Sequence, residues 1–195
     1  MDNTAILKEF EAAEAILKGH FILSSGLHSD TYLQCARVMM DANRGERLCK
    51  ALAAKIRDSD IGSIDICVAP AMGGVVVGYE LARQLGVEGI FCERQNGTFT
   101  IRRGFSFPQG ARVLMVEDVV TTGKSSLEAM ECVRECGGVV VGEASLVNRS
   151  DRHNPLPVPL ISLLELEVQT YFTDSLPAHL QAIDPEKPGS RWIKS

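Results

Sequence analysis

Four short apolar runs, separated by segments of helical periodicity, constrain the fold of this chain more than any other feature. Runs this short and this rich in branched side chains are typical of buried parallel strands, because a strand that is covered on both faces has no polar side. Helix-like segments at residues 75–85 and 125–136 lie between them. The pattern therefore predicts βαβ units and an α/β fold, with an open, mostly parallel sheet flanked by helices. The four runs are residues 64–69, 89–92, 112–116 and 139–147.

The residues before this pattern predict a smaller N-terminal structure. Residues 4–17 place apolar side chains on one helical stripe, and residues 21–35 have the composition of a strand, a turn and a second strand. A further helix follows, and Asp41 or Asn43 would cap it. We expect a helix followed by a small hairpin that acts as a hood over the core.

The C-terminal residues predict a tail rather than a second domain. Residues 154–160 hold three prolines, and the residues that follow are weakly periodic, so we expect the tail to wrap back over the hairpin. A chain of 195 residues suits one domain. We expect one compact unit in which residues 1–40, with part of the tail, form the N-terminal helix and hood. Residues 41–195 form the α/β core and tail.

Composition and charge exclude several classes of protein. The chain is 45% hydrophobic and 23% charged, as globular proteins are, and no apolar run approaches the roughly 18 residues of a spanning helix. The net charge of −5 disfavours binding to a nucleic acid backbone. The six cysteines show neither a CxxC pair nor zinc-ligand spacing, which favours reduced thiols. We therefore expect a cytoplasmic protein that binds neither membrane nor nucleic acid.

Residues 113–126 carry the clearest chemical signal. An apolar strand runs into Glu117 and Asp118, and a loop rich in hydroxyl groups then leads into a helix. Ligands of open α/β sheets bind beyond the carboxyl ends of the strands, and the free N–H groups and dipole of a helix start favour phosphate. The candidate binding residues are Glu117, Asp118, Val119, Val120, Thr121, Thr122, Gly123, Lys124 and Ser125.

The spacing of this loop decides which phosphate compound it suits. A nucleoside triphosphate loop requires glycine five positions before Gly123, where Asp118 stands, so that class is excluded. Two acids before a phosphate site would repel a triphosphate but suit the vicinal hydroxyls of a ribose. The residues predict a sugar 5-phosphate site. The alternative is an acidic strand end followed by an ordinary helix cap.

This stretch is similar to the phosphoribosyl diphosphate motif of the type I phosphoribosyltransferases, and other stretches narrow the resemblance to the orotate phosphoribosyltransferases. Residues 19–29 with Tyr32 resemble the hood of that family. Residues 69–74 resemble its diphosphate loop, and residues 93–105 its mobile catalytic loop. The end of a strand at residues 147–149 and the signature at residues 187–191 complete a resemblance that spans residues 19–191.

The resemblance implies a role for each matching residue. Glu117 and Asp118 would hold the ribose hydroxyls, and the loop from Thr121 to Ser125 would bind the 5-phosphate. Thr121 would also lie near orotate. Arg149 would pair with the orotate carboxylate, a contact that suits the planar guanidinium group. Without the neighbouring motif, Arg149 would be read as a solvated loop residue.

Two further segments gain a role from the resemblance. Four residues would form the diphosphate loop, although tight helix packing also explains their glycines; they are Ala71, Met72, Gly73 and Gly74. Three arginines flank a glycine turn and would bring positive charge to the departing diphosphate, although a solvated charged hairpin also explains them. They are Arg94, a ligand of the phosphosugar, and Arg102 and Arg103, the tentative catalytic residues.

The resemblance implies the type I phosphoribosyltransferase fold and the transfer of a phosphoribosyl group to orotate in pyrimidine synthesis. Mg²⁺ would be held through the diphosphate with no direct protein ligand, and a homodimer would share its active sites. The rivals are a purine phosphoribosyltransferase and a non-catalytic phosphosugar sensor of the same fold. The chain also departs from the family pattern. Gly73 and Ser24 stand where many bacterial members carry lysine, Lys124 replaces a glycine, and Asn148 replaces an aspartate.

Overall fold

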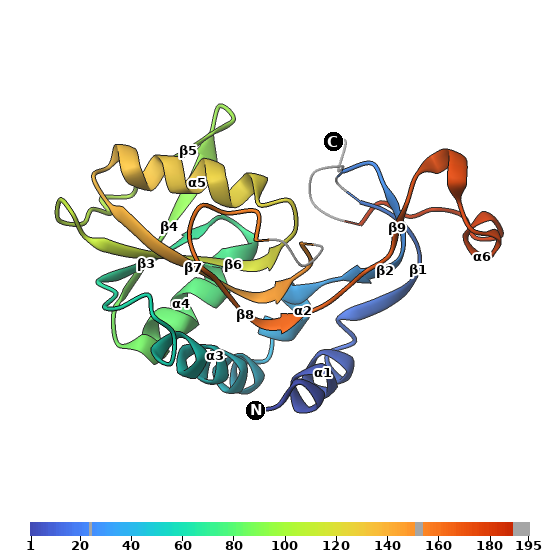
Figure 1. Cartoon of the computed structure of the whole chain (residues 1–195), viewed down its shortest axis with the longest axis horizontal. Helices are drawn as coiled ribbons and strands as arrows, with labels where there is room; N and C mark the ends of the chain where they lie inside the picture. The colour runs from blue at the N-terminus through green and yellow to red at the C-terminus, as the bar shows by residue number, and fades with distance from the viewer. Residues whose placement is uncertain (24, 151–153, 189–195) are drawn as a thin grey trace.

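The computed structural model describes residues 1–23, 25–150 and 154–188 (Figure 1). Ser24 of the expected hood and residues 189–191 of the expected C-terminal signature lie outside this part of the chain. The described strands form two sheets, one of six strands and one of three.

The six-stranded sheet confirms the predicted α/β class. Its strand order is β5-β4-β3-β6-β7-β8, and every neighbouring pair is parallel except β4 with β5. The crossovers between β3, β4, β6 and β7 coincide with the predicted βαβ units. The strands are β3 (Ile66–Pro70), β4 (Glu88–Gln95), β5 (Thr98–Ile101), β6 (Arg112–Val120), β7 (Val139–Asn148) and β8 (Leu160–Glu165).

Strand β6 is longer than its apolar run predicts. The apolar run stops at Val116, but pairing with β7 continues from Glu117, opposite Ser145, to Val120, opposite Asn148. The backbone hydrogen bonds of β7 extend the strand past the end of its apolar residues. Glu117 and Asp118 are therefore held by the sheet and do not belong to a loop.

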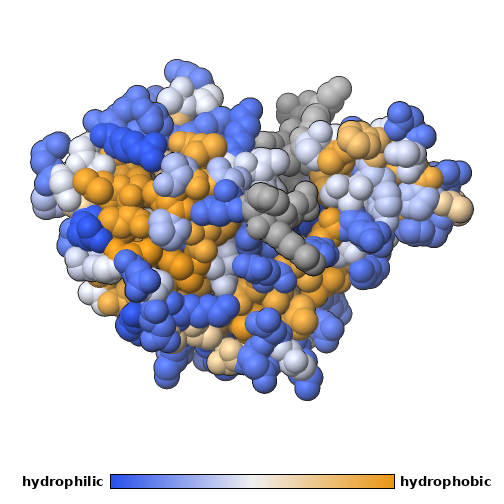
Figure 2. All heavy atoms as spheres, viewed as in Figure 1, coloured by the Kyte–Doolittle hydropathy of each residue, from blue (hydrophilic) through white to orange (hydrophobic). Residues whose placement is uncertain are grey.

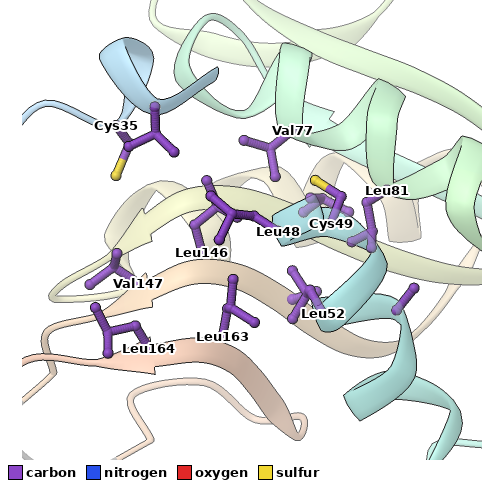
Figure 3. Close-up of a cluster of buried hydrophobic side chains, with 14 of the residues drawn as sticks. Cys35, Leu48, Cys49, Leu52, Val77, Leu81, Leu146, Val147, Leu163 and Leu164 are labelled. Atoms are coloured by element: carbon purple, nitrogen blue, oxygen red, sulfur yellow. The ribbon is translucent and has the colours of Figure 1, made fainter. Parts of the chain in front are cut away.

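Three long helices cover the sheet: α3 (Ala42–Arg57), α4 (Gly73–Leu85) and α5 (Lys124–Glu135). Alternate residues of a strand point to opposite faces, so Leu114 of β6 packs in the cluster with α3 and α4, whereas Met115 packs in the cluster with α5. Figure 1 shows α5 on one side of the sheet and α3 and α4 on the other. Figure 3 shows part of the larger cluster, with Leu48, Leu52, Val77, Leu81, Leu146 and Leu163.

The three-stranded sheet forms the hood and confirms the predicted hairpin. Its order is β1-β2-β9 and both pairs are antiparallel. The predicted return of the tail is also confirmed, because β9 pairs with β2 and Glu186 bridges to Phe21. The strands are β1 (Ile16–Ile22), β2 (His28–Leu33) and β9 (Thr170–Tyr171).

Two buried histidines join the hood to the tail. Nδ1 of His20 donates to the carbonyl oxygen of Ile183 over 2.7 Å, because a carbonyl only accepts. Nε2 of His20 lies 2.6 Å from Nδ1 of His28, whose Nε2 lies 3.1 Å from Oγ1 of Thr173. The chain of contacts therefore crosses both strands of the hairpin and reaches the tail at two points.

The N-terminal helix is shorter than predicted. α1 (Asn3–Ala12) does not reach residue 17, because Glu14 takes a left-handed φ of 48° and β1 then begins at Ile16. Asp2 caps α1 by accepting from the Ala5 N–H over 2.8 Å. Asp41 caps α3 as predicted, by accepting from the next two N–H groups of the chain.

The tail contains a strand that was not predicted. Residues 160–165 were expected to belong to the tail over the hairpin, but they form β8 at the edge of the main sheet. The short helical segments were also not predicted. They are α2 (Cys35–Met39), η1 (Thr173–Ser175) and α6 (Ala178–Gln181).

The surface is mixed in character. Figure 2 shows apolar residues gathered on the left of the viewed face, where the main sheet lies, with hydrophilic residues around them. Among the helices of the described residues, none combines the length and the apolar composition that crossing a bilayer requires.

Candidate active site

A pocket of about 320 Å³ lies where β3 and β6 end and α4 and α5 begin. This is the position at which open α/β sheets bind their ligands. The pocket draws residues from the predicted diphosphate loop, the predicted acidic pair and the predicted phosphate loop. Its lining residues are Pro70, Ala71, Met72, Gly73, Glu117, Asp118 and Ser125.

The two acids of β6 are largely withdrawn from water. Glu117 is buried, and Asp118 Oδ1 accepts from the N–H of Val119 over 2.9 Å. Burial raises the pKa of Asp118, because a carboxylate loses hydration when it is enclosed, and the backbone hydrogen bonds only partly offset this. A ligand that brings hydroxyl donors or a cation to this pocket would stabilise the ionised carboxyl group.

The diphosphate loop approaches the acids closely. A Cβ atom on Gly73 would lie 2.8 Å from Oδ2 of Asp118, and one on Gly74 would lie 2.7 Å from the carbonyl oxygen of Val116. A side chain at either position would therefore require a shift, of the Asp118 carboxylate for Gly73 and of the β6 backbone for Gly74.

The phosphate loop ends at the start of α5. Gly123 takes a left-handed φ of 71° and is the N-cap residue, so no side chain caps the helix from that position. Ser125 lines the pocket, whereas Thr121, Thr122 and Lys124 are exposed beside it. The N–H groups of the first turn are therefore oriented toward the pocket end of the helix, where an anion is favoured.

Comparisons with known proteins agree with this geometry. A family model described as phosphoribosyl transferase domain matches residues 39–169. The chain is 56% identical over 194 residues to the orotate phosphoribosyltransferase of Sphingopyxis alaskensis, and the match covers 99% of each chain. It is 50% identical over 194 residues to that of Phenylobacterium zucineum, and this match covers 100% of each. The chain belongs to the orotate phosphoribosyltransferase family.

A solved structure supports the same assignment. The crystal structure of orotate phosphoribosyltransferase from Aeropyrum pernix matches with a TM-score of 0.67 and 26% identity, over 82% of this chain and 93% of that one. The predicted type I phosphoribosyltransferase fold is confirmed. The resemblance that the sequence motifs indicated is confirmed with it.

Arg149 directly follows the end of β7, next to the end of β6. Its N–H donates to the carbonyl oxygen of Val120 over 2.8 Å. The pKa of Tyr32 in the hood is raised by burial and by the charge of Asp118, and is lowered by Arg149. Burial raises the pKa of Cys35, and the same two charges act on that thiol. Tyr32 and Cys35 therefore lie within the electric field of both Asp118 and Arg149.

The three arginines of the expected mobile loop are not among the residues that line the pocket. Arg94 donates to the carbonyl oxygen of Gly97 over 2.7 Å and pairs with Glu128 of α5. Arg102 and Arg103 both pair with Glu93, at 3.8 Å and 2.9 Å. Within this chain, Arg102 and Arg103 therefore pair with β4, and Arg94 links β4 to α5.

Pro70, which belongs to the stretch 69–74 that resembles the diphosphate loop, was not singled out as a binding residue but lines the pocket at the end of β3. Cys35 was missed. It lies within the field of Asp118, but no sequence pattern pointed to it.

The donor chemistry of the pocket fits a hard cation. Glu117 and Asp118 offer carboxylate oxygens, which are the ligands that Mg²⁺ prefers. Within residues 1–23, 25–150 and 154–188, no group of three or more His, Cys, Asp or Glu side chains could hold a metal ion. A magnesium ion at these acids would therefore require oxygens from a ligand or from water.

Proposed function

We propose that the protein transfers the 5-phosphoribosyl group of phosphoribosyl diphosphate to orotate. The products are orotidine 5-phosphate and diphosphate, in the synthesis of UMP. The observation that carries this proposal is the pocket in which a diphosphate loop, two buried acids and a helix start meet. Family membership over the whole chain identifies the base as orotate.

The two acids serve the sugar. When diphosphate leaves, positive charge develops at C1 of the ribose, and carboxylates that hold the 2- and 3-hydroxyls stabilise this charge. Glu117 and Asp118 line the same pocket and are supported by the sheet, so they do not have to reorganise as the charge forms. The loop from Thr121 to Ser125 would hold the 5-phosphate at the start of α5.

Arg149 serves the base. Arg149 follows the end of β7, its N–H bonds to Val120, and its charge acts on Tyr32, a place that suits contact with the orotate carboxylate. Thr121 directly follows Val120, the last residue of β6. Orotate reacts as a dianion that has already lost the proton of N1. The protein therefore needs no general base, and its task is to position the base over C1 of the ribose.

Mg²⁺ is the proposed cofactor. Bound to the oxygens of the diphosphate, it would neutralise the charge of the leaving group. Glu117 and Asp118 would hold the sugar side of this complex, and the backbone of residues 71–74 would face the diphosphate.

The proposed partner is a second copy of the chain. The charged residues that line the pocket are both acids, Glu117 and Asp118, whereas a departing diphosphate needs positive charge. The side chains of Arg102 and Arg103 are 50% and 59% exposed, so they are accessible to a neighbouring subunit. A homodimer in which this loop enters the neighbour's pocket would complete the charge balance.

Two further assignments remain proposals. The first is that residues 1–40, with part of the tail, form the hood, and that residues 41–195 form the core of one compact unit. Ile6 of α1 shares a hydrophobic cluster with Leu146 of β7, which supports a close association of the two parts. The second is a cytoplasmic location, which the six free cysteines support.

The function is tested by assaying purified protein with phosphoribosyl diphosphate and Mg²⁺ against orotate, uracil, hypoxanthine and adenine. Of the four bases, only orotate should be converted, and orotidine 5-phosphate and diphosphate should form in equal amounts. Turnover of hypoxanthine or adenine instead would show a purine transferase. Binding of phosphoribosyl diphosphate without turnover of any base would show a sensor.

A further inference from the structure

A buried acid lies under the phosphate helix, outside the pocket. Glu143 of β7 is 0% exposed. Its Oε1 accepts from Oγ of Ser126 over 2.6 Å, and its Oε2 has no hydrogen-bond partner among the described residues. An enclosed carboxyl group that is only half satisfied costs folding free energy, so its presence calls for a physical reason.

The surroundings of Glu143 give it little else to contact. Its register neighbours are Met115 of β6 and Leu160 of β8, both apolar. From the helix above, the group that reaches it is the hydroxyl of Ser126. The carboxyl group therefore acts on the first turn of α5.

Ser126 is well placed to transmit such an effect. It is 2% exposed, it lies in the first turn of α5, and it directly follows Ser125, which lines the pocket. Because the N-cap residue Gly123 has no side chain, capping does not fix this turn. The hydrogen bond from Ser126 to Glu143 ties the start of the helix to the sheet.

We propose that Glu143 is a positioning residue for the 5-phosphate site, which holds the first turn of α5 in place through Ser126. The proposal rests on the proposed function, because it takes the start of α5 as the phosphate-binding element. Glu143 itself touches no substrate. Its contribution is to fix the N–H groups that would bind phosphate.

The charge of Glu143 adds a second consequence. Burial raises the pKa of Glu143 to about 7, and the hydrogen bond from Ser126 lowers it in part. A phosphate dianion at the start of α5 would favour the neutral carboxyl group, because like charges repel. Affinity for phosphoribosyl diphosphate should therefore fall as the pH rises and Glu143 ionises.

The test compares three variants of the full chain by calorimetry and steady-state kinetics. Ser126→Ala removes the hydroxyl donor. Glu143→Gln keeps an acceptor for Ser126 but cannot ionise. Ser145→Ala is the matched control, because Ser145 lies on the same strand, is equally buried and shares a 2.6 Å hydrogen bond with Ser162 of β8 rather than with α5.

We expect Ser126→Ala to raise the Kd and KM for phosphoribosyl diphosphate roughly 10-fold and the KM for orotate less than about 2-fold. Ser145→Ala should change neither constant, and Glu143→Gln should bind as the wild type does at pH 6, where the wild-type carboxyl group is mostly protonated. The ratio of the wild-type KM for phosphoribosyl diphosphate to that of Glu143→Gln should rise about 3-fold between pH 6 and pH 8. Titration of the substrates affects the wild type and the variant equally, so it does not change this ratio.

Equal effects of Ser126→Ala and Ser145→Ala on the affinity for phosphoribosyl diphosphate would overturn the proposal, as would equal changes in both Michaelis constants. If the ratio of the two Michaelis constants does not change between pH 6 and pH 8, the proposed effect of Glu143 ionisation on binding is overturned. If the wild type binds phosphoribosyl diphosphate but does not convert orotate, the proposed function fails. The calorimetric comparison of the variants still decides the role of Glu143 in that case.

Discussion

At the scale of single residues, the pocket keeps Asp118 in an environment that disfavours its charge. Burial raises the pKa of Asp118, because the ionised carboxylate is less stable in the folded protein than in water. Ionisation of Asp118 therefore lowers the stability of the folded state. A group whose pKa is raised in the folded state contributes its full stabilisation at pH values below its pKa in the unfolded state. This contribution is lost as the pH rises through its pKa in the folded state. Such a residue is retained for binding and not for stability.

The first prediction concerns these acids. Asp118→Asn and Glu117→Gln should each lower kcat/KM about 10- to 100-fold, because each loses a charge-assisted hydrogen bond to the reacting sugar. The melting temperature of Asp118→Asn at neutral pH should equal or exceed that of the wild type. Kinetics and thermal unfolding of the same samples check both statements. Near wild-type turnover in both variants would remove the ribose assignment.

The second prediction concerns Arg149. Arg149→Ala should raise the KM for orotate roughly 10-fold or more, while the KM for phosphoribosyl diphosphate changes much less, because a bidentate carboxylate contact is lost. Arg149→Lys is the control that keeps the charge but not the planar guanidinium group. Its KM for orotate should lie between that of the wild type and that of Arg149→Ala. If both Michaelis constants rise equally in Arg149→Ala, the arginine supports the structure and does not bind the base.

The third prediction concerns the effect of Glu143 on the pH dependence of protein stability. The pKa of this buried carboxyl group is raised from 4.5 to about 7, so the folded state retains a proton that the unfolded state releases between these values. Stability should therefore fall as the pH rises from 4.5 to 7, by up to about 3 kcal/mol. Glu143→Gln should show a smaller loss over the same range in urea unfolding. An identical pH dependence in both proteins would contradict the assignment.

At the scale of elements, the sequence predicts the parts that are locally encoded. The β3, β6 and β7 runs and the helices α3, α4 and α5 follow from periodicity and capping. Strand β8 was missed because it follows the proline-rich stretch of residues 154–160, and its place at the sheet edge depends on tertiary pairing with β7. α1 stops short of the predicted end because Glu14 adopts a left-handed conformation, which the apolar stripe does not reveal.

The candidate site shows the same division. The motif at residues 113–126 identifies the acids and the phosphate loop, because their spacing is local. That β3 and β6 are neighbours, and so bring Gly73 to Asp118, depends on the strand order. The pairing of Arg103 with Glu93, and of Glu143 with Ser126, arises from tertiary packing that no pattern in the sequence specifies.

The fourth prediction concerns the loop between β3 and α4. Gly73→Ala would place Cβ 2.8 Å from Oδ2 of Asp118, so the loop or the acid must move. Displacing a reacting group by about 1 Å costs about 100-fold in rate, so we expect a loss in kcat/KM of that order. Gly45→Ala is the matched control, because its Cβ would meet the flexible end of Met39 and lies inside α3.

The control should keep full activity. Alanine in the interior of a helix is favoured over glycine by up to about 1 kcal/mol, so Gly45→Ala should melt at the same temperature as the wild type or above it. Both variants are compared by kinetics and by circular dichroism melts. Wild-type activity in Gly73→Ala would show that the close approach of the loop to Asp118 does not matter for binding.

At the scale of the whole molecule, the arginines of the expected mobile loop lie outside the lining of the pocket. Arg102 and Arg103 pair with Glu93 on the β4–β5 side, whereas the pocket presents Glu117 and Asp118. A salt bridge on the surface contributes little, so the arginines can leave Glu93 at small cost. A loop from a neighbouring copy could then supply the positive charge that a departing diphosphate requires.

The fifth prediction tests this arrangement by mixing two inactive variants. Asp118→Asn removes an acid from the pocket, and Arg103→Ala removes a cation from the loop. If the loop acts on the neighbour's pocket, a heterodimer of the two has one site with both defects and one site with neither. Dissociating, mixing and reassociating the variants in equal amounts should therefore restore up to about a quarter of wild-type activity, because half of the dimers are mixed and each has one intact site. Native mass spectrometry verifies that heterodimers form. A mixture that contains heterodimers and yet remains inactive means that the loop serves its own subunit's pocket or none.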